Sequence, residues 1–133
     1  LHDSRGDATL VDPGCYDALE QKQLLDYVTT QGLHIRRIVN THAHIDHVLG
    51  VAFAKRQFGV PFALHRLDEP LLKAVKAYAP NYGFPAFDDP EVEEWLEEGN
   101  EICLGDIYAG SCARTYCTRL PRTAVCCGRR RAV

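Results

Sequence analysis

Short β-prone runs alternate with amphipathic helical segments along the first 80 residues, and this alternation is the strongest constraint on the fold. The predicted elements, strand and helix in turn, are residues 8–11, 17–31, 34–40, 48–58, 61–65 and 68–79. Consecutive strands joined through a helix need a crossover connection, which favours parallel strands covered by helices. The sequence therefore predicts an α/β fold.

The pattern becomes less regular after residue 80. Residues 80–90 contain three prolines and a glycine, which predicts a loop. Residues 91–98 are strongly acidic and are typical of a short helix or an irregular segment, and residues 101–104 are predicted to form a strand. Beyond Asp106 there is no clear hydrophobic period, so we assign no secondary structure there.

Charge and cysteine content divide the chain into two parts. Residues 1–106 hold all 18 acidic residues and nine of the 15 basic ones, for a net charge of −9, whereas residues 107–133 hold six arginines and no acid, for +6. All six histidines precede residue 66, and five of the six cysteines lie at or after Cys103. We therefore expect one partial domain at residues 1–106, followed by an Arg/Cys-rich tail of uncertain structure at residues 107–133.

The composition excludes several classes of protein. Apolar residues make up 46% of the chain and charged residues 25%, which is typical of a folded domain. No run approaches the roughly 18 apolar residues that a membrane span needs, and the first residues lack a signal-peptide pattern, so we expect a cytoplasmic protein without a membrane partner. Arg129–Arg131 have no aromatic partners, so we expect a solvated tail and no nucleic-acid binding.

One segment concentrates residues with metal-binding chemistry. Residues 42–47 read His-Ala-His-Ile-Asp-His and follow directly on a predicted strand. On a loop at a strand's carboxyl end, His42 and His44 can face one point while Asp46 and His47 face a neighbouring one, with nitrogen and oxygen ligands that suit zinc, manganese or iron. Two ions about 3.5 to 4 Å apart can activate a water and polarise a carbonyl, which favours hydrolysis. A merely polar surface loop is the alternative, but four candidate ligands in six residues favour metal binding.

This His-x-His-x-Asp-His motif, preceded by Leu-Val-Asp-Pro-Gly at residues 10–14, resembles the metallo-β-lactamase superfamily and, more narrowly, its glyoxalase II-like (hydroxyacylglutathione hydrolase-like) members. The resemblance runs from about residue 8 to residue 106, and includes residues 40–50, Leu64-His65 and residues 97–99. It implies an αββα sandwich with its site at the sheet edge, of which this chain is expected to hold only the N-terminal half.

The resemblance also implies roles for individual residues. His42 and His44 would bind a first metal, and Asp46 and His47 a second, with two zinc ions in the complete family site and iron or manganese as alternatives. Asp46 would also be catalytic, because its family counterpart orients the attacking hydroxide. Asp12 would steady the site from behind the ligands, although a turn-forming aspartate is an equally good interpretation.

The chain departs from the family pattern after residue 65. The family completes its site with a histidine in a Pro-Gly-His segment, a bridging aspartate and a last histidine, yet no histidine follows His65 and no acidic residue follows Asp106. A frame change in the gene is one explanation of the unusual tail. Another is that cysteine thiolates replace the missing ligands, the candidates being Cys112, Cys117 and Cys126.

Three functions are compatible with these features. The first is a metal-dependent hydrolase, in which a metal-bound hydroxide attacks a small-molecule thioester of the hydroxyacyl-glutathione type; β-lactams, lactones and phosphoesters suit the same chemistry. The second is a mononuclear iron persulfide dioxygenase of the same fold, which iron content and oxygen uptake would distinguish. The third is a catalytically inactive truncated fragment. Unpaired sheet edges in a half-domain also predict a homo-oligomer.

Overall fold

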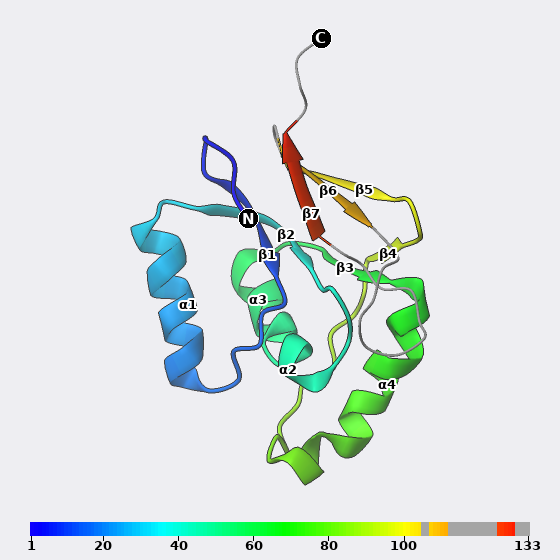
Figure 1. The fold of residues 1–133 in the computed structure, drawn as a ribbon. Helices are drawn as coiled ribbons and strands as arrows, with labels where there is room; N and C mark the ends of the chain where they lie inside the picture. The colour runs from blue at the N-terminus through cyan, green and yellow to red at the C-terminus, as the bar shows by residue number, and fades with distance from the viewer. Residues whose placement is uncertain (105–106, 112–124, 130–133) are drawn as a thin grey trace.

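The computed structural model describes residues 1–104, 107–111 and 125–129 (Figure 1). Four parallel strands form the first sheet in the order β1-β2-β3-β4. Their bounds are Asp7–Val11 for β1, His34–Val39 for β2, Phe62–His65 for β3 and Glu94–Leu96 for β4. The parallel strand order follows from the helical crossovers between them, as the alternation predicted.

Four α-helices and two short 3-10 turns connect the strands of the first sheet. They are α1 (Ala18–Thr30), α2 (Ile45–Val48), α3 (Val51–Phe58), η1 (Arg66–Asp68), α4 (Glu69–Tyr78) and η2 (Ala79–Tyr82). Local signals set some of these ends. Asp17 and Glu20 form a reciprocal capping box at the start of α1, and Gly59 ends α3 in the left-handed conformation.

A second, antiparallel sheet contains β5 (Glu101–Leu104), β6 (Ile107–Ser111) and β7 (Val125–Arg129), in that order. In Figure 1 it lies on the other side of the first sheet from α2, α3 and α4. Ile102 of β5 belongs to a buried cluster with Val39, Ala63 and Leu96 of the first sheet. This contact buries the sheet face that the helices leave open.

Alternation of side chains along the strands creates two separate hydrophobic layers. Ile38, Phe62 and Leu64 point into the larger core, which α3 and α4 cover with residues such as Val51 and Val75. The intervening residues point to the opposite face, towards β5. Helices therefore cover one face and a second sheet the other, which is the half-sandwich arrangement that the sequence predicted.

Three details differ from the sequence expectations. The helix predicted at residues 48–58 is two helices, because the chain turns at Gly50, whose N–H donates to the Pro13 carbonyl at 2.9 Å. The acidic segment 91–98 contains β4 rather than a helix, because it pairs with β3 in register. Residues 107–133, for which no structure was predicted, contain β6 and β7. The division of the chain at residue 106 stays a prediction, and strand pairing between β5 and β6 crosses it.

Candidate metal centre

The predicted ligands lie at the edge of the first sheet where its parallel strands end. Asp12 follows β1, residues 40–47 follow β2, and His65 is the last residue of β3. In open α/β sheets this carboxyl edge is where ligands bind, because the loops that leave the strands converge there. The register pairs Val11 with Val39, so Asp12 and the histidine loop emerge side by side.

Three imidazole rings lie close together in this loop. The His42 ring lies 4.5 Å from that of His44 and 3.9 Å from that of His47, measured between ring centroids. The nearest nitrogens of the first pair, Nε2 of His42 and Nδ1 of His44, are 3.0 Å apart. All three rings are half-buried, so they are shielded from part of the solvent but remain accessible.

Asp46 is the most exposed member of the group. It lies in the first turn of α2, and 75% of its side chain is exposed. Its Oδ2 atom is 3.5 Å from Nε2 of His47. Contacts therefore join all four predicted ligands: the His42 ring contacts those of His44 and His47, and Asp46 contacts His47.

Asp12 connects the loop after β1 to the histidine loop. Its carboxylate accepts two hydrogen bonds from Thr41, from the backbone N–H at 2.8 Å and from the hydroxyl at 2.7 Å. The Oδ2 atom of Asp12 is also 3.2 Å from Nδ1 of His47. Asp12 has a positive φ of 48°, a left-handed conformation that aspartate tolerates better than most residues. These contacts favour a steadying role for Asp12 over that of a turn residue alone.

Two further contacts shape the histidine loop and its packing against the loop after β1. Asn40, fully buried at the end of β2, donates from Nδ2 to the carbonyl oxygen of His47 at 2.7 Å and so closes the histidine loop. A Cβ atom on Gly14 would lie only 2.2 Å from the carbonyl oxygen of Asp46. The loop after β1 therefore packs directly against the start of α2.

The donor set fits a transition-metal ion in kind, since imidazole nitrogens and a carboxylate are the ligands that zinc and iron prefer. Nδ1 of His47 is buried and lies 3.2 Å from Oδ2 of Asp12, but it makes no hydrogen bond within the described part of the structure. Among the described residues, however, no group of three or more His, Cys, Asp or Glu side chains is arranged to hold an ion. The assignment of His42, His44, Asp46 and His47 as ligands therefore stays a prediction.

Sequence reasoning missed three residues around this group. Asn40 and Thr41 directly precede the motif, but nothing in the sequence indicates their hydrogen-bond partners. Tyr78 packs against the core but is half-buried, and burial, followed by Tyr82 and the Asp46 carboxylate, raises the pKa of its hydroxyl. His65, the last residue of β3, is buried, and its Nδ1 accepts from the Leu67 N–H at 3.2 Å.

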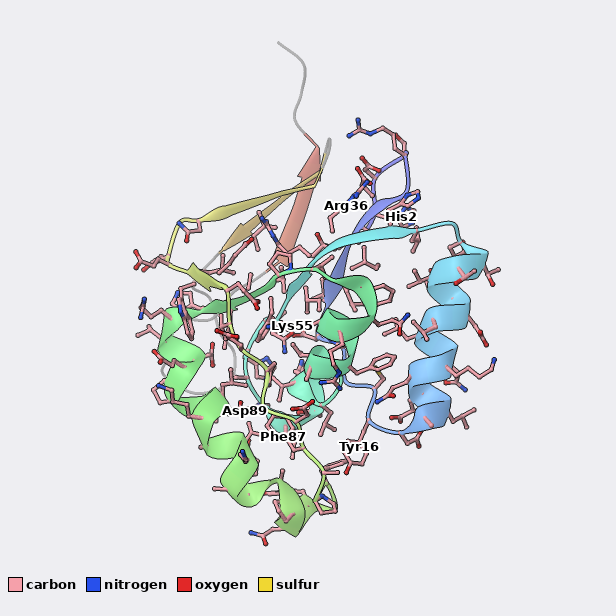
Figure 2. All side chains as sticks on the ribbon, turned by 180° about the vertical axis from the view of Figure 1, so that it is seen from behind. His2, Tyr16, Arg36, Lys55, Phe87 and Asp89 are labelled. Carbon is pink, nitrogen blue, oxygen red and sulfur yellow. The ribbon has the colours of Figure 1, made fainter. Side chains whose placement is uncertain are left out.

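A neighbouring aromatic contact fixes the loop beyond α4. The ring of Tyr16 lies 5.0 Å from that of Phe84 at a steep angle, and the Tyr16 hydroxyl accepts from the Ala86 N–H at 3.2 Å. Figure 2 shows Tyr16 and Phe87 on the same side of the molecule, far from His2 and Arg36. The loop of residues 83–87 is thereby attached to the segment that follows Asp12.

Several sequence expectations cannot be compared with side-chain positions. Cys112 and Cys117 lie outside the described residues, as do Arg130 and Arg131, and of Cys126 only the backbone strand is described. Replacement of the missing ligands by cysteine therefore stays a prediction, as do the frame change, the homo-oligomer and the cytoplasmic location. Within the described part of the chain, no helix combines the length and apolar character needed to cross a membrane.

Comparisons with known proteins identify the family. The sequence model of the metallo-β-lactamase superfamily matches residues 2–107. An uncharacterized protein of Aquifex aeolicus is 35% identical over 104 residues, which are 77% of this chain and 46% of that protein. The hydroxyacylglutathione hydrolase GloC of Haemophilus influenzae is 27% identical over 103 residues, which are 77% of this chain and 47% of that enzyme.

A solved structure agrees with these sequence relatives. The protein TTHA1623, crystallised in a di-iron-bound form, is 35% identical and superposes with a TM-score of 0.59, covering 76% of this chain and 48% of its own. The chain thus spans about half the length of each of these relatives. The match over residues 2–107 and the αββ layers confirm the predicted resemblance. The chain belongs to the metallo-β-lactamase superfamily.

Proposed function

We propose that this chain carries metal ligands of a hydrolase that cleaves thioesters of the hydroxyacyl-glutathione type. The observation that carries the proposal is the gathering of three imidazoles and one exposed carboxylate, His42, His44, His47 and Asp46, at the carboxyl edge of a parallel sheet. Two further facts support it: members of this superfamily are mostly metal-dependent hydrolases, and one of its relatives is named a hydroxyacylglutathione hydrolase.

In this proposal, His42 and His44 hold one ion, and Asp46 and His47 hold a second, with zinc as the proposed metal and iron or manganese as alternatives. Such ions supply a lowered water pKa and polarisation of the carbonyl under attack. The chain's own residues contribute orientation. Asp12 holds the Thr41 end of the loop through two hydrogen bonds, while Asn40 holds the His47 end through one.

The position of Asp46 suits a residue that orients a water molecule. Its carboxylate is largely exposed at the start of α2, and an ionised carboxylate only accepts hydrogen bonds. It can therefore orient a water molecule by accepting one of its hydrogens at Oδ1 or Oδ2.

A thioester suits this set of side chains because its leaving group needs little help. A thiol has an ordinary pKa near 8.5, so the thiolate departs without a strong proton donor. The amine that leaves a β-lactam must gain a proton, which demands a general acid. We therefore expect thioester hydrolysis to exceed β-lactam hydrolysis.

The test is thiol release from an α-hydroxyacyl thioester of glutathione by the zinc-loaded chain. Asp46→Asn is expected to lower the rate on the order of 100-fold, since it removes the acceptor for water while keeping the side chain's shape. Asp89→Asn is the matched control, because Asp89 is an exposed carboxylate on the loop before β4 and should leave the rate unchanged. Equal rates for the two variants would contradict the role of Asp46. Oxygen uptake with a glutathione persulfide by the iron-loaded chain would favour a dioxygenase instead.

A further inference from the structure

Thr41 lies between the Asp12 carboxylate and the His42 ring. Its Oγ1 atom is 2.7 Å from Oδ2 of Asp12 and 2.9 Å from Nδ1 of His42. Its backbone N–H donates to the other oxygen of the same carboxylate at 2.8 Å. Two bonds to one carboxylate fix both the backbone and the side chain of Thr41, so its hydroxyl has a defined position against the imidazole.

The hydrogens available to these hydrogen bonds determine the tautomer of His42. A threonine hydroxyl has one hydrogen, and an ionised carboxylate can only accept. The hydroxyl hydrogen therefore points to Asp12, and the hydroxyl oxygen is left to accept from Nδ1 of His42. For that bond to form, the ring hydrogen of His42 must be on Nδ1. A neutral imidazole with its hydrogen on Nδ1 has its lone pair on Nε2.

The lone pair on Nε2 of His42 faces the ring of His44. Nε2 of His42 is the atom that lies 3.0 Å from Nδ1 of His44. In metal sites a carboxylate often accepts the free ring N–H of a ligating histidine, which fixes the tautomer and makes the ligand more basic. Here a threonine hydroxyl stands between the carboxylate and the ring, so the effect of Asp12 reaches His42 only through Thr41.

We propose that Thr41 is a positioning residue that relays the effect of the Asp12 carboxylate to His42 and keeps that ring in the Nδ1–H tautomer, so that the lone pair by which His42 would bind an ion is on Nε2. The tautomer itself needs no metal, whereas its use in metal binding rests on the proposed function. The two parts can therefore fail separately.

The first experiment reads the ring nitrogens of the metal-free full chain by ¹⁵N NMR, at a pH where the ring is neutral. The His42 signals are identified by their loss in His42→Asn. We expect a protonated Nδ1 and an unprotonated Nε2 in the unmodified chain. A His42 ring with its hydrogen on Nε2 would overturn the proposal, and this reading does not depend on any variant of Thr41 folding.

The second experiment compares variants of Thr41. Thr41→Val keeps the shape but removes the hydroxyl, so His42 should shift towards the Nε2–H form, whereas Thr41→Ser should restore Nδ1–H. Zinc affinity should fall about 10- to 100-fold in Thr41→Val, as when other partners of a ligating histidine are removed, and should recover in Thr41→Ser. Thr29→Val, on the exposed surface of α1, is the control and should change neither property.

The results of the two experiments distinguish the role of Thr41 from metal binding by the loop. An Nδ1–H ring in a chain that binds no zinc would support the relay and contradict the proposed function. A Thr41→Val chain that loses zinc while His42 keeps its tautomer would overturn the relay, because the hydroxyl would then affect zinc binding without setting the tautomer.

Discussion

Gly14 lies so close to the start of α2 that the contact can be tested with one methyl group. A Cβ atom at position 14 would be 2.2 Å from the carbonyl oxygen of Asp46, whereas real Cβ contacts are essentially never under 3.0 Å. Gly14→Ala must therefore move one of the two backbones by at least about 0.8 Å. Gly14 does not have a positive φ, so the cost is steric and not conformational.

The size of the effect follows from the atoms involved. Overpacking of a well-packed site costs about 1–3 kcal/mol, and the upper part of that range applies because the clash is with backbone, which cannot rotate away. The displacement also moves Asp46 relative to His47. We expect the free energy of unfolding, from urea titrations followed by circular dichroism, to fall by about 2–3 kcal/mol, and zinc affinity to fall about tenfold, which is 1.4 kcal/mol.

Gly32→Ala is the control that separates the steric clash at position 14 from the general cost of replacing a glycine by alanine. Gly32 has a φ of 61° and no heavy atom within 4 Å of its hypothetical Cβ, so alanine there costs about 1 kcal/mol of backbone strain and should not affect zinc binding. A Gly14→Ala chain as stable as the unmodified one would refute the reasoning. So would an equal loss of zinc affinity in both variants.

The remaining predictions concern the scaffold. Burial tends to raise the pKa of Glu93, but Lys55 Nζ at 2.5 Å and the Phe62 N–H at 2.9 Å outweigh it and hold the pKa below its ordinary value of 4.5. The stability that Glu93 contributes is therefore present above about pH 4.5 and lost as the pH falls through the lowered pKa. Glu93→Gln should flatten this acid limb in unfolding measurements from pH 6 to 3, and an unchanged limb would count against it. Phe62→Ala, at a fully buried core position, should cost about 3–5 kcal/mol, whereas Tyr82→Ala, at a largely exposed one, should cost less than about 0.5 kcal/mol. Similar losses in the two would contradict the core described for β3.

The elements that the sequence predicted well are those with local signals. The capping box at Asp17 and the left-handed Gly59 mark helix ends in the sequence itself. The strand at residues 94–96 has no such signal, because its composition is acidic and its structure depends on pairing with β3 and on the ion pair between Arg37 and Glu94 at 3.1 Å. Tertiary contacts override local preference there.

The same distinction applies to the site. The four candidate ligands lie within six residues, so the motif alone places them in one loop. The contact of Asp12 with Thr41 joins residues 29 positions apart and depends on the parallel pairing of β1 with β2. Nothing in the sequence indicates that the Thr41 hydroxyl stands between a carboxylate and a ring, because this requires the register of two strands.

Zinc content per chain, measured by elemental analysis of the desalted full chain, tests the central claim most directly. The account predicts about one or two zinc ions per chain, lost in His42→Ala. The matched control is His34→Ala, because His34 is exposed at the opposite end of β2 and its loss should leave the zinc content unchanged. A chain without zinc, or one that keeps it in His42→Ala, would contradict the claim that this histidine loop is a metal centre.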